Sequence, residues 1–128
     1  MTPEEYFTNW TKNGDKLLPL NRQKLDELNL QSFTISYLEV GLPEDAAPYI
    51  SFVDDSEHLY NGIAKLEDQY DFDFEHNKYV VIASDGSGNP IVVNIKNNDI
   101  IEWLDHDNYF EPSYCNNSLK SLLIFLMI

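Results

Sequence analysis

The Asp105-His106-Asp107 triplet comes closest in residue type to a metal or acid–base site. Imidazole and carboxylate groups bind Zn²⁺ and transfer protons near neutral pH. Neighbouring side chains on an extended backbone point to opposite faces, however, so we expect these three groups not to converge on one ion. No second cluster of His, Cys or Glu lies nearby in the sequence. We therefore predict a structural histidine that pairs with loop carbonyls, with no metal and no cofactor.

The glycine-rich segment at residues 84–90 invites a phosphate-binding or calcium-binding interpretation. A phosphate loop ends in Gly-Lys-Ser/Thr and opens a helix, and a dinucleotide loop needs a third glycine, but here a second β-branched run follows. A calcium loop needs glycine where Pro90 stands and a carboxylate where Lys96 stands. The pattern favours a β-hairpin instead. Its structural turn residues are Asp85, Gly86, Gly88 and Pro90.

Acidic residues dominate the charge of the chain, which carries 22 acids, 8 bases and a formal net charge of −14. Half of that charge lies between residues 54 and 75, where Lys65 is the single base. Such a field repels nucleic acid and anionic lipid and attracts a cationic protein surface, although acids can also serve solubility alone. The candidate partner-binding residues are Asp54, Asp55, Glu57, Glu67, Asp68, Asp71, Asp73 and Glu75.

Helix-type patterns come first along the chain. Thr2 and Glu5 form a capping box, Asn21 caps a second short helix, and Ser32 opens a third that ends at Gly41. A last helix begins after Asn117 or Ser118. In the third helix, Phe33, Tyr37 and Val40 share one stripe, and we expect Phe33, Tyr37 and Leu122 to pack over the sheet.

Strand-type patterns follow at residues 50–53, 62–66, 79–83, 91–95 and 100–104. Asn61-Gly62 and Asn97-Asn98-Asp99 indicate turns, so the last three strands should form a meander with Ile82, Val92 and Ile101 buried. This order predicts an α+β fold: a single antiparallel, meander-rich sheet with the N-terminal helices and a C-terminal helix packed on one side.

Length and composition indicate one domain over residues 1–128 in a reducing, cytoplasmic setting. Cys115 is the single cysteine, so no disulfide forms within the chain. The start has acids where an export signal needs bases, and the apolar stretch from Leu119 to Ile128 is about half a membrane span, which predicts a buried helix. That stretch ends without a capping residue, which leaves open a continuation past Ile128.

Four blocks resemble the SUKH superfamily, in the order that family has them. They are residues 41–52 (GLPEDAAPYISF), 79–90 (YVVIASDGSGNP), 103–107 (WLDHD) and 116–119 (NNSL). Ala83 departs from the glycine that the family often has. The resemblance implies an α+β domain without enzyme activity, and the small size and acidity are similar to its bacterial branch of immunity proteins, which neutralise toxins such as nucleases and deaminases.

Three functions stay open. The leading expectation is an immunity protein that binds and blocks a cognate basic toxin domain through its acidic surface, with neither nucleic acid nor membrane as partner. The alternative is a non-catalytic regulatory or ligand-binding module whose acidity serves solubility only. A metal-dependent enzyme using Asp105, His106 and Asp107 ranks third.

Overall fold

The computed structural model describes residues 2–11, 16–43, 50–53, 56–75 and 77–126. The elements, in chain order, are α1 (Pro3–Thr11), β1 (Leu17–Leu18), α2 (Arg22–Asp26), α3 (Ser32–Val40), β2 (Leu42–Pro43), β3 (Ile50–Phe52), α4 (Ser56–Tyr70), β4 (Tyr79–Asp85), β5 (Pro90–Asn94), β6 (Ile100–Asp105), β7 (Glu111–Asn116) and α5 (Leu119–Leu126).

The predicted α+β fold and its antiparallel meander are confirmed. Five strands form one sheet in the order β3-β4-β5-β6-β7, and every pair is antiparallel. Val81 pairs with Val92 and Val93 with Ile101, and Ile82, Val92 and Ile101 are fully buried. A separate pair, β1 with β2, forms a small second sheet.

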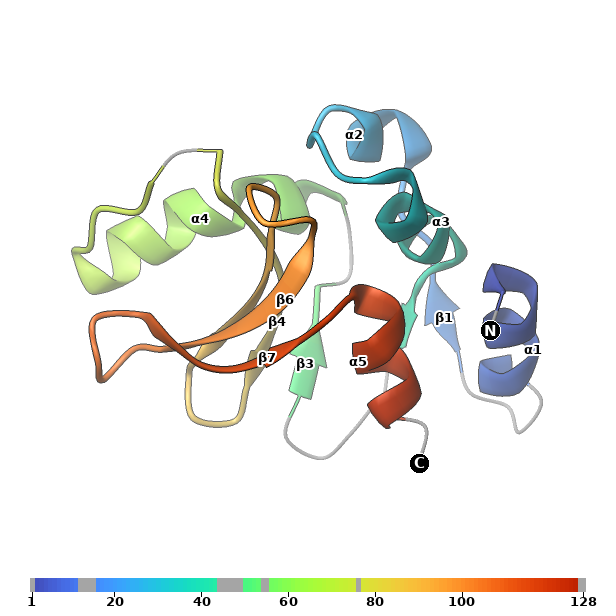
Figure 1. Cartoon of the computed structure of the whole chain (residues 1–128). Coiled ribbons are helices and arrows are strands. Elements are labelled where there is room, and N and C mark those ends of the chain that lie inside the picture. Colours follow the sequence, from blue (N-terminus) through green and yellow to red (C-terminus); the bar gives the residue numbers. More distant parts are fainter. Residues whose placement is uncertain (1, 12–15, 44–49, 54–55, 76, 127–128) are drawn as a thin grey trace.

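Helices cover both faces of the five-stranded sheet, which corrects the expectation that they lie on one side (Figure 1). The core on one face, around Ile82, Ile91 and Ile101, also contains side chains from α1, α2, α3 and α5 and Leu59 from the start of α4. The opposite face packs mainly with α4, around Val81, Val92 and Leu104. Because successive residues on a strand point to opposite faces, the continuous apolar runs of β4 and β5 are explained by burial on both sides.

The helix α4 replaces the strand and turn that were expected at residues 61–66. Leu59, Ile63, Leu66 and Tyr70 recur at helical spacing, and all four pack toward the sheet. Gly62 lies inside the helix, and glycine is needed at this position because a Cβ would approach the Val81 Cβ to 2.6 Å. The glycine that suggested a turn is therefore a site of close helix–sheet contact.

Helix ends follow the predicted capping residues closely. The Glu5 N–H donates to Thr2 Oγ1 at 3.1 Å, and the Lys24 N–H donates to Asn21 Oδ1 at 3.2 Å. Gly41 ends α3 with φ +125°, and the Ser121 N–H donates to Ser118 Oγ at 3.1 Å at the start of α5. The three hydrogen bonds satisfy backbone N–H groups that a helix leaves unpaired.

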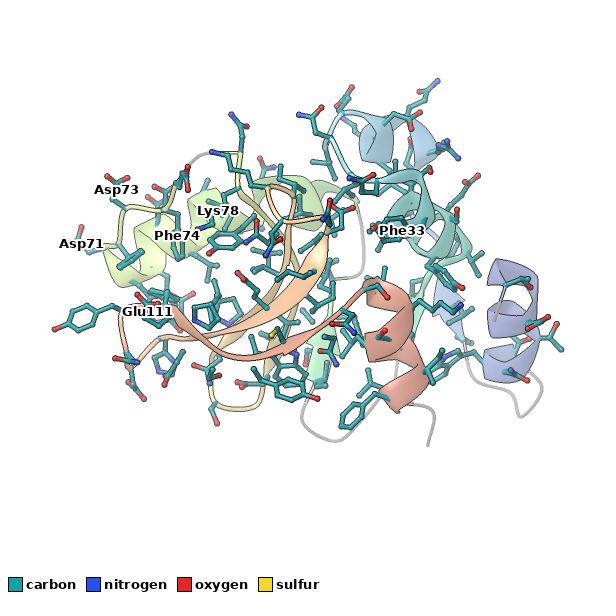
Figure 2. All side chains as sticks on the ribbon, in the orientation of Figure 1. Phe33, Asp71, Asp73, Phe74, Lys78 and Glu111 are labelled. Carbon is teal, nitrogen blue, oxygen red and sulfur yellow. The ribbon has the colours of Figure 1, made fainter. Side chains whose placement is uncertain are left out.

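The helix α3 is rotated relative to the predicted stripe. Its buried side chains are Thr34, Ile35, Tyr37 and Leu38, whereas Phe33 is 45% exposed (Figure 2). Tyr37 and Leu122 are buried as expected, but the placement of Phe33 over the sheet was wrong.

The rotation of α3 is explained by a contact at its N-terminus, where a residue distant in sequence caps the helix. Asp99, in the β5–β6 turn, is fully buried. Its Oδ2 accepts hydrogen bonds from the Gln31 N–H and from Thr34 Oγ1, both at 2.7 Å. Since Thr34 must face Asp99, the preceding Phe33 turns toward solvent.

Candidate partner-binding site

The described members of the acidic segment lie at the C-terminal half of α4 and in the loop that follows it (Figure 2). Glu67 and Asp68 belong to α4, and Asp71, Asp73 and Glu75 belong to the loop. Asp54 and Asp55 lie outside the described residues, as does the side chain of Glu57.

The loop acids differ in whether the protein already uses them. Glu75 accepts from Lys96 Nζ at 2.6 Å and lies 3.8 Å from Lys78 Nζ, and the hydrogen bond from Lys96 lowers its pKa. Asp71 and Asp73 have no ion pair or hydrogen bond to any described residue. Glu75 therefore anchors the loop, while Asp71 and Asp73 keep their charges available for a partner.

A pocket of about 240 Å³ opens between this loop and the β6–β7 hairpin. Phe72, Asp73 and Phe74 line it from the loop, and Phe110 and Glu111 line it from the hairpin. The Phe110 ring centroid lies 4.8 Å from that of Phe72 and 4.9 Å from that of Phe74. The aromatic cluster fixes the two segments against each other and gives the pocket rigid apolar walls.

A buried carboxylate lies in the same pocket. Glu102 pairs with Val92 across β5 and β6, so its side chain lies on the α4 face of the sheet. It is 8% exposed, and its Oε1 accepts from Asn94 Nδ2 at 3.3 Å. Burial raises the pKa of the neighbouring Tyr79, and the negative charge of Glu102 raises it further. Among the described residues, Glu102 has no ion-pair partner.

Sequence reasoning missed Glu102 and Glu111 because each is a single acid far from the acidic segment. Glu111 begins β7, an edge strand that was not predicted because Pro112 and five exposed residues hide its strand character. The hairpin tip brings it to the pocket through unusual backbone, with φ +54° at Tyr109 and +58° at Phe110. The alternation of aromatics and acids over residues 72–75, together with the two aromatics and one acid at residues 109–111, is the pattern that could have marked the site.

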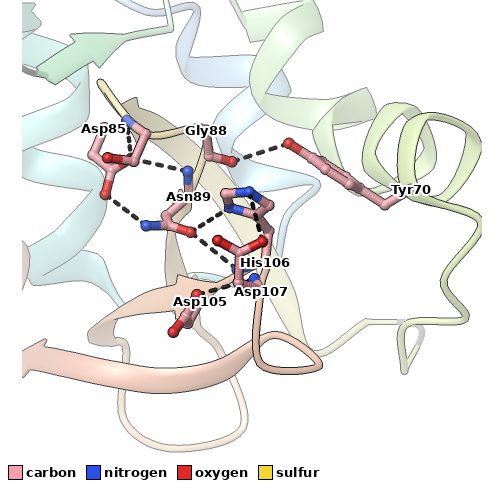
Figure 3. A network of polar contacts seen from close by, with 8 residues as sticks. Tyr70, Asp85, Gly88, Asn89, Asp105, His106 and Asp107 are labelled. Carbon is pink, nitrogen blue, oxygen red and sulfur yellow. Dashed lines mark hydrogen bonds and ion pairs between the residues drawn. The ribbon is translucent and has the colours of Figure 1, made fainter.

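The glycine-rich segment forms the tight turn between β4 and β5, at the place where the sequence predicts a hairpin (Figure 3). Asp85 Oδ1 accepts from the Ser87 N–H at 2.8 Å and from the Asn89 N–H at 2.9 Å. Asn89 Oδ1 in turn lies 2.9 Å from the His106 N and 2.6 Å from His106 Nδ1. The Tyr70 hydroxyl donates to the Gly88 carbonyl at 3.1 Å, which ties the turn to α4.

Replacing Gly88 by valine should cost about 1–2 kcal/mol of unfolding free energy, because Gly88 has φ +86°. An added Cβ would also lie 3.3 Å from the Tyr70 hydroxyl oxygen. Gly86 has no positive φ, so Gly86→Val is the matched control and should change stability by about 0.5 kcal/mol or less. Urea unfolding of both variants measures the difference, and equal midpoints would contradict it.

Asp85 should make the turn sensitive to acid. Burial raises the pKa of Asp85, but hydrogen bonds from Asn89 and Ser87 outweigh burial and hold the pKa below its usual value. A lowered folded-state pKa stabilises the protein above the unfolded-state value of about 3.9, and this stabilisation is lost as pH falls through the folded-state pKa. Asp85→Asn should cost about 1 kcal/mol at pH 7, and its difference from wild type should narrow below about pH 4. Urea unfolding at several pH values tests this, and a constant difference would count against it.

The Asp105-His106-Asp107 triplet does converge, which corrects the geometric expectation. Residues 106–110 form a turn rather than extended backbone, and one ligand atom from each residue lies within 4.8 Å of the others. Asp105 Oδ1 already accepts from the Asp107 N–H at 3.0 Å, and His106 contacts Asn89. Asp107 has an 84% exposed side chain. The three residues belong to the β6–β7 turn: Asp105 bonds within this turn, and His106 joins it to Asn89 of the β4–β5 hairpin.

Glu67 lines a different pocket, of about 280 Å³, between α2 and α4. Glu27 also lines it, and among the described lining residues Tyr79 is the one aromatic. Asp68 is exposed on α4 and lines neither pocket. The described acids thus fall into two groups. The loop group, Asp71, Asp73 and Glu75, lies at the aromatic pocket, and the helix group, Glu67 and Asp68, lies on α4 apart from it.

Comparisons with protein-family models, with curated proteins and with solved structures find no match to this chain. The SUKH resemblance therefore stays an expectation that rests on the four sequence blocks. In the part of the chain that the structure describes, no helix combines the length and the apolar composition needed to cross a membrane.

Proposed function

We propose that this protein is a non-catalytic immunity protein that binds and neutralises a basic toxin domain. The observation that carries the proposal is the loop group of acids. Asp71 and Asp73 have no partners among the described residues. Asp73 lines an aromatic pocket together with Glu102 and Glu111, and Asp71 lies beside that pocket. Charges of one sign beside rigid aromatic groups suit recognition of a cationic protein surface.

The charge of the whole chain supports the same partner. A net charge of −14 repels polyanions and accelerates encounter with a basic protein. A nuclease or deaminase must present basic groups to nucleic acid, so an acidic inhibitor placed over those groups would compete directly with the substrate. The resemblance to the immunity branch of the SUKH superfamily points to such a toxin.

The test is co-expression of this protein with each product of the genes that flank its own. We expect one flanking product to arrest growth alone, to be tolerated when both proteins are made, and to elute with this protein as one complex from a sizing column. If no flanking product is both toxic and bound, the immunity proposal is wrong.

A further inference from the structure

We infer that the pocket between residues 72–74 and residues 109–111 binds one arginine side chain of the partner. The inference rests on the proposed function in one respect, that the partner is a basic protein. It adds the residue type that the partner inserts and the residues that receive it.

The charge of Glu102 is the first argument. A carboxylate that is 92% buried normally pairs with a cation, because burial of an unpaired charge is costly. Here both hydrogen-bond partners are neutral, since Asn94 Nδ2 donates to Oε1 at 3.3 Å and the Tyr79 hydroxyl also bonds to Glu102, and no cation of the described chain makes an ion pair with Glu102. Asp73, Glu75 and Glu111 line the same pocket. An incoming cation would meet four acids and a single base, Lys78.

Lys78 does not supply the missing cation. Its Nζ lies 3.8 Å from Glu75 Oε2 and 5.1 Å from the centroid of the Tyr79 ring. It therefore lies over an aromatic face of the pocket without a hydrogen bond to Glu102. This position shows that the pocket accepts a cation above a ring. The Lys78 charge also attracts Glu102, but it leaves the buried carboxylate without an ion pair.

The shape and the walls of the pocket favour arginine. A volume of about 240 Å³ is below the range of about 300–1,000 Å³ that is usual for small-molecule sites, so one side chain suits it better than a cofactor. Guanidinium is planar, stacks on rings and donates two parallel hydrogen bonds to a carboxylate, whereas an ammonium group offers a point charge. The ring of Tyr79, which already has a cation above it, and the carboxylate of Glu102 both line the pocket and suit these properties.

The probe is N-acetylarginine methylamide, titrated into the ¹⁵N-labelled full chain and followed by NMR. We expect saturable shifts at residues 72–75, 79, 102 and 109–111. The citrulline analogue, which has the same shape without the charge, should bind at least tenfold more weakly. The lysine analogue should bind several-fold more weakly than the arginine probe. Shifts spread over the acidic surface, or equal binding of arginine and citrulline, would overturn the inference.

Two variants should change the affinity in opposite directions. Glu102→Gln removes the charge and keeps the shape, so it should weaken arginine binding at least fivefold. Lys78→Met removes the competing cation and should tighten binding about threefold, while Lys96 still holds Glu75. Asp68→Asn, which removes an acid outside the pocket, should change nothing. If Glu102→Gln does not fold, Lys78→Met carries the test, and unchanged affinity in that variant would overturn the inference.

The inference and the proposed function can fail separately. If the arginine probe binds the pocket but no flanking gene product binds the protein, the arginine site stands and the immunity proposal fails. If a toxic flanking product binds wild type and Glu102→Gln with equal affinity, the immunity proposal stands and the arginine site is wrong.

Discussion

Asp99→Ala should lower the free energy of unfolding by about 3 kcal/mol. Asp99 is fully buried, and its Oδ2 accepts the Gln31 N–H and the Thr34 hydroxyl at 2.7 Å. Hydrogen bonds to a charged group contribute about 1.5–3 kcal/mol each, and a negative charge at a helix N-terminus adds up to about 1 kcal/mol. Removal of a buried carboxylate whose Oδ1 has no described partner offsets part of that loss.

The neighbouring Asn98 provides a matched control. Asn98 has φ +52° and Asp99 has φ +58°, so alanine meets the same backbone strain at both positions. Asn98 is exposed and makes no side-chain hydrogen bond to a described residue, so Asn98→Ala should cost about 1 kcal/mol. Urea unfolding of both variants measures the contribution of the hydrogen bonds. Equal losses would mean that the cap from the β5–β6 turn contributes no stability.

Reversal of the loop acids should slow association with the basic partner at least tenfold. The variant is Asp71→Lys with Asp73→Lys, tested against the flanking gene product that forms a complex. Exposed charges steer the encounter of two proteins, and two lysines beside the pocket would repel a basic surface. Stability should barely change, because neither acid has a described partner to lose. Stopped-flow kinetics measures the association rate constant.

A control variant of equal charge separates local from global effects. Glu27→Lys with Glu39→Lys changes the acid that follows α2 and an acid on α3, on another part of the molecule (Figure 1). Each replacement adds two positive units, so both double variants go from −14 to −10. The control should slow association by about threefold or less, and the rate constant of wild type should fall as salt rises. Equal slowing by both variants would leave net charge, rather than the loop, as the cause.

The parts of the fold that were predicted correctly depend on local chemistry. Local hydrogen bonds fix the predicted caps at Thr2, Asn21 and Ser118 and the turn at Asp85–Pro90. Each bond joins residues two to four positions apart, so a short stretch of sequence contains both partners. The prediction of a turn and a strand at residues 61–66 was wrong because glycine in isolation indicates a turn. Gly62 is needed instead for a close contact with Val81, nineteen positions away in the sequence. The prediction that Phe33 packs over the sheet was also wrong because of a contact distant in sequence: Asp99 bonds Thr34 and so determines which side of α3 faces inward.

The candidate site was predictable only in part. Asp71 and Asp73 stand in a visible acidic run, but the same run contains Glu75, which the fold uses for ion pairs with Lys96 and Lys78. Glu102 looks like the polar position of an ordinary strand, because alternation alone does not reveal that both faces of the sheet are covered. The pocket exists only where the loop, the β6–β7 hairpin and the sheet face meet.

The two edge strands limit how another chain can approach this sheet. An exposed edge invites strand-to-strand pairing, and proteins prevent this with short strands, prolines, charges and bulges. Here β3 has three residues, while β7 begins with Glu111 and Pro112 and pairs with β6 through a register shift at Trp103/Leu104. Growth of the sheet into a self-associated or aggregated array is thereby disfavoured at both edges. Recognition by this protein is consequently left to side chains, whose identity can vary between partners without disturbing the backbone pairing.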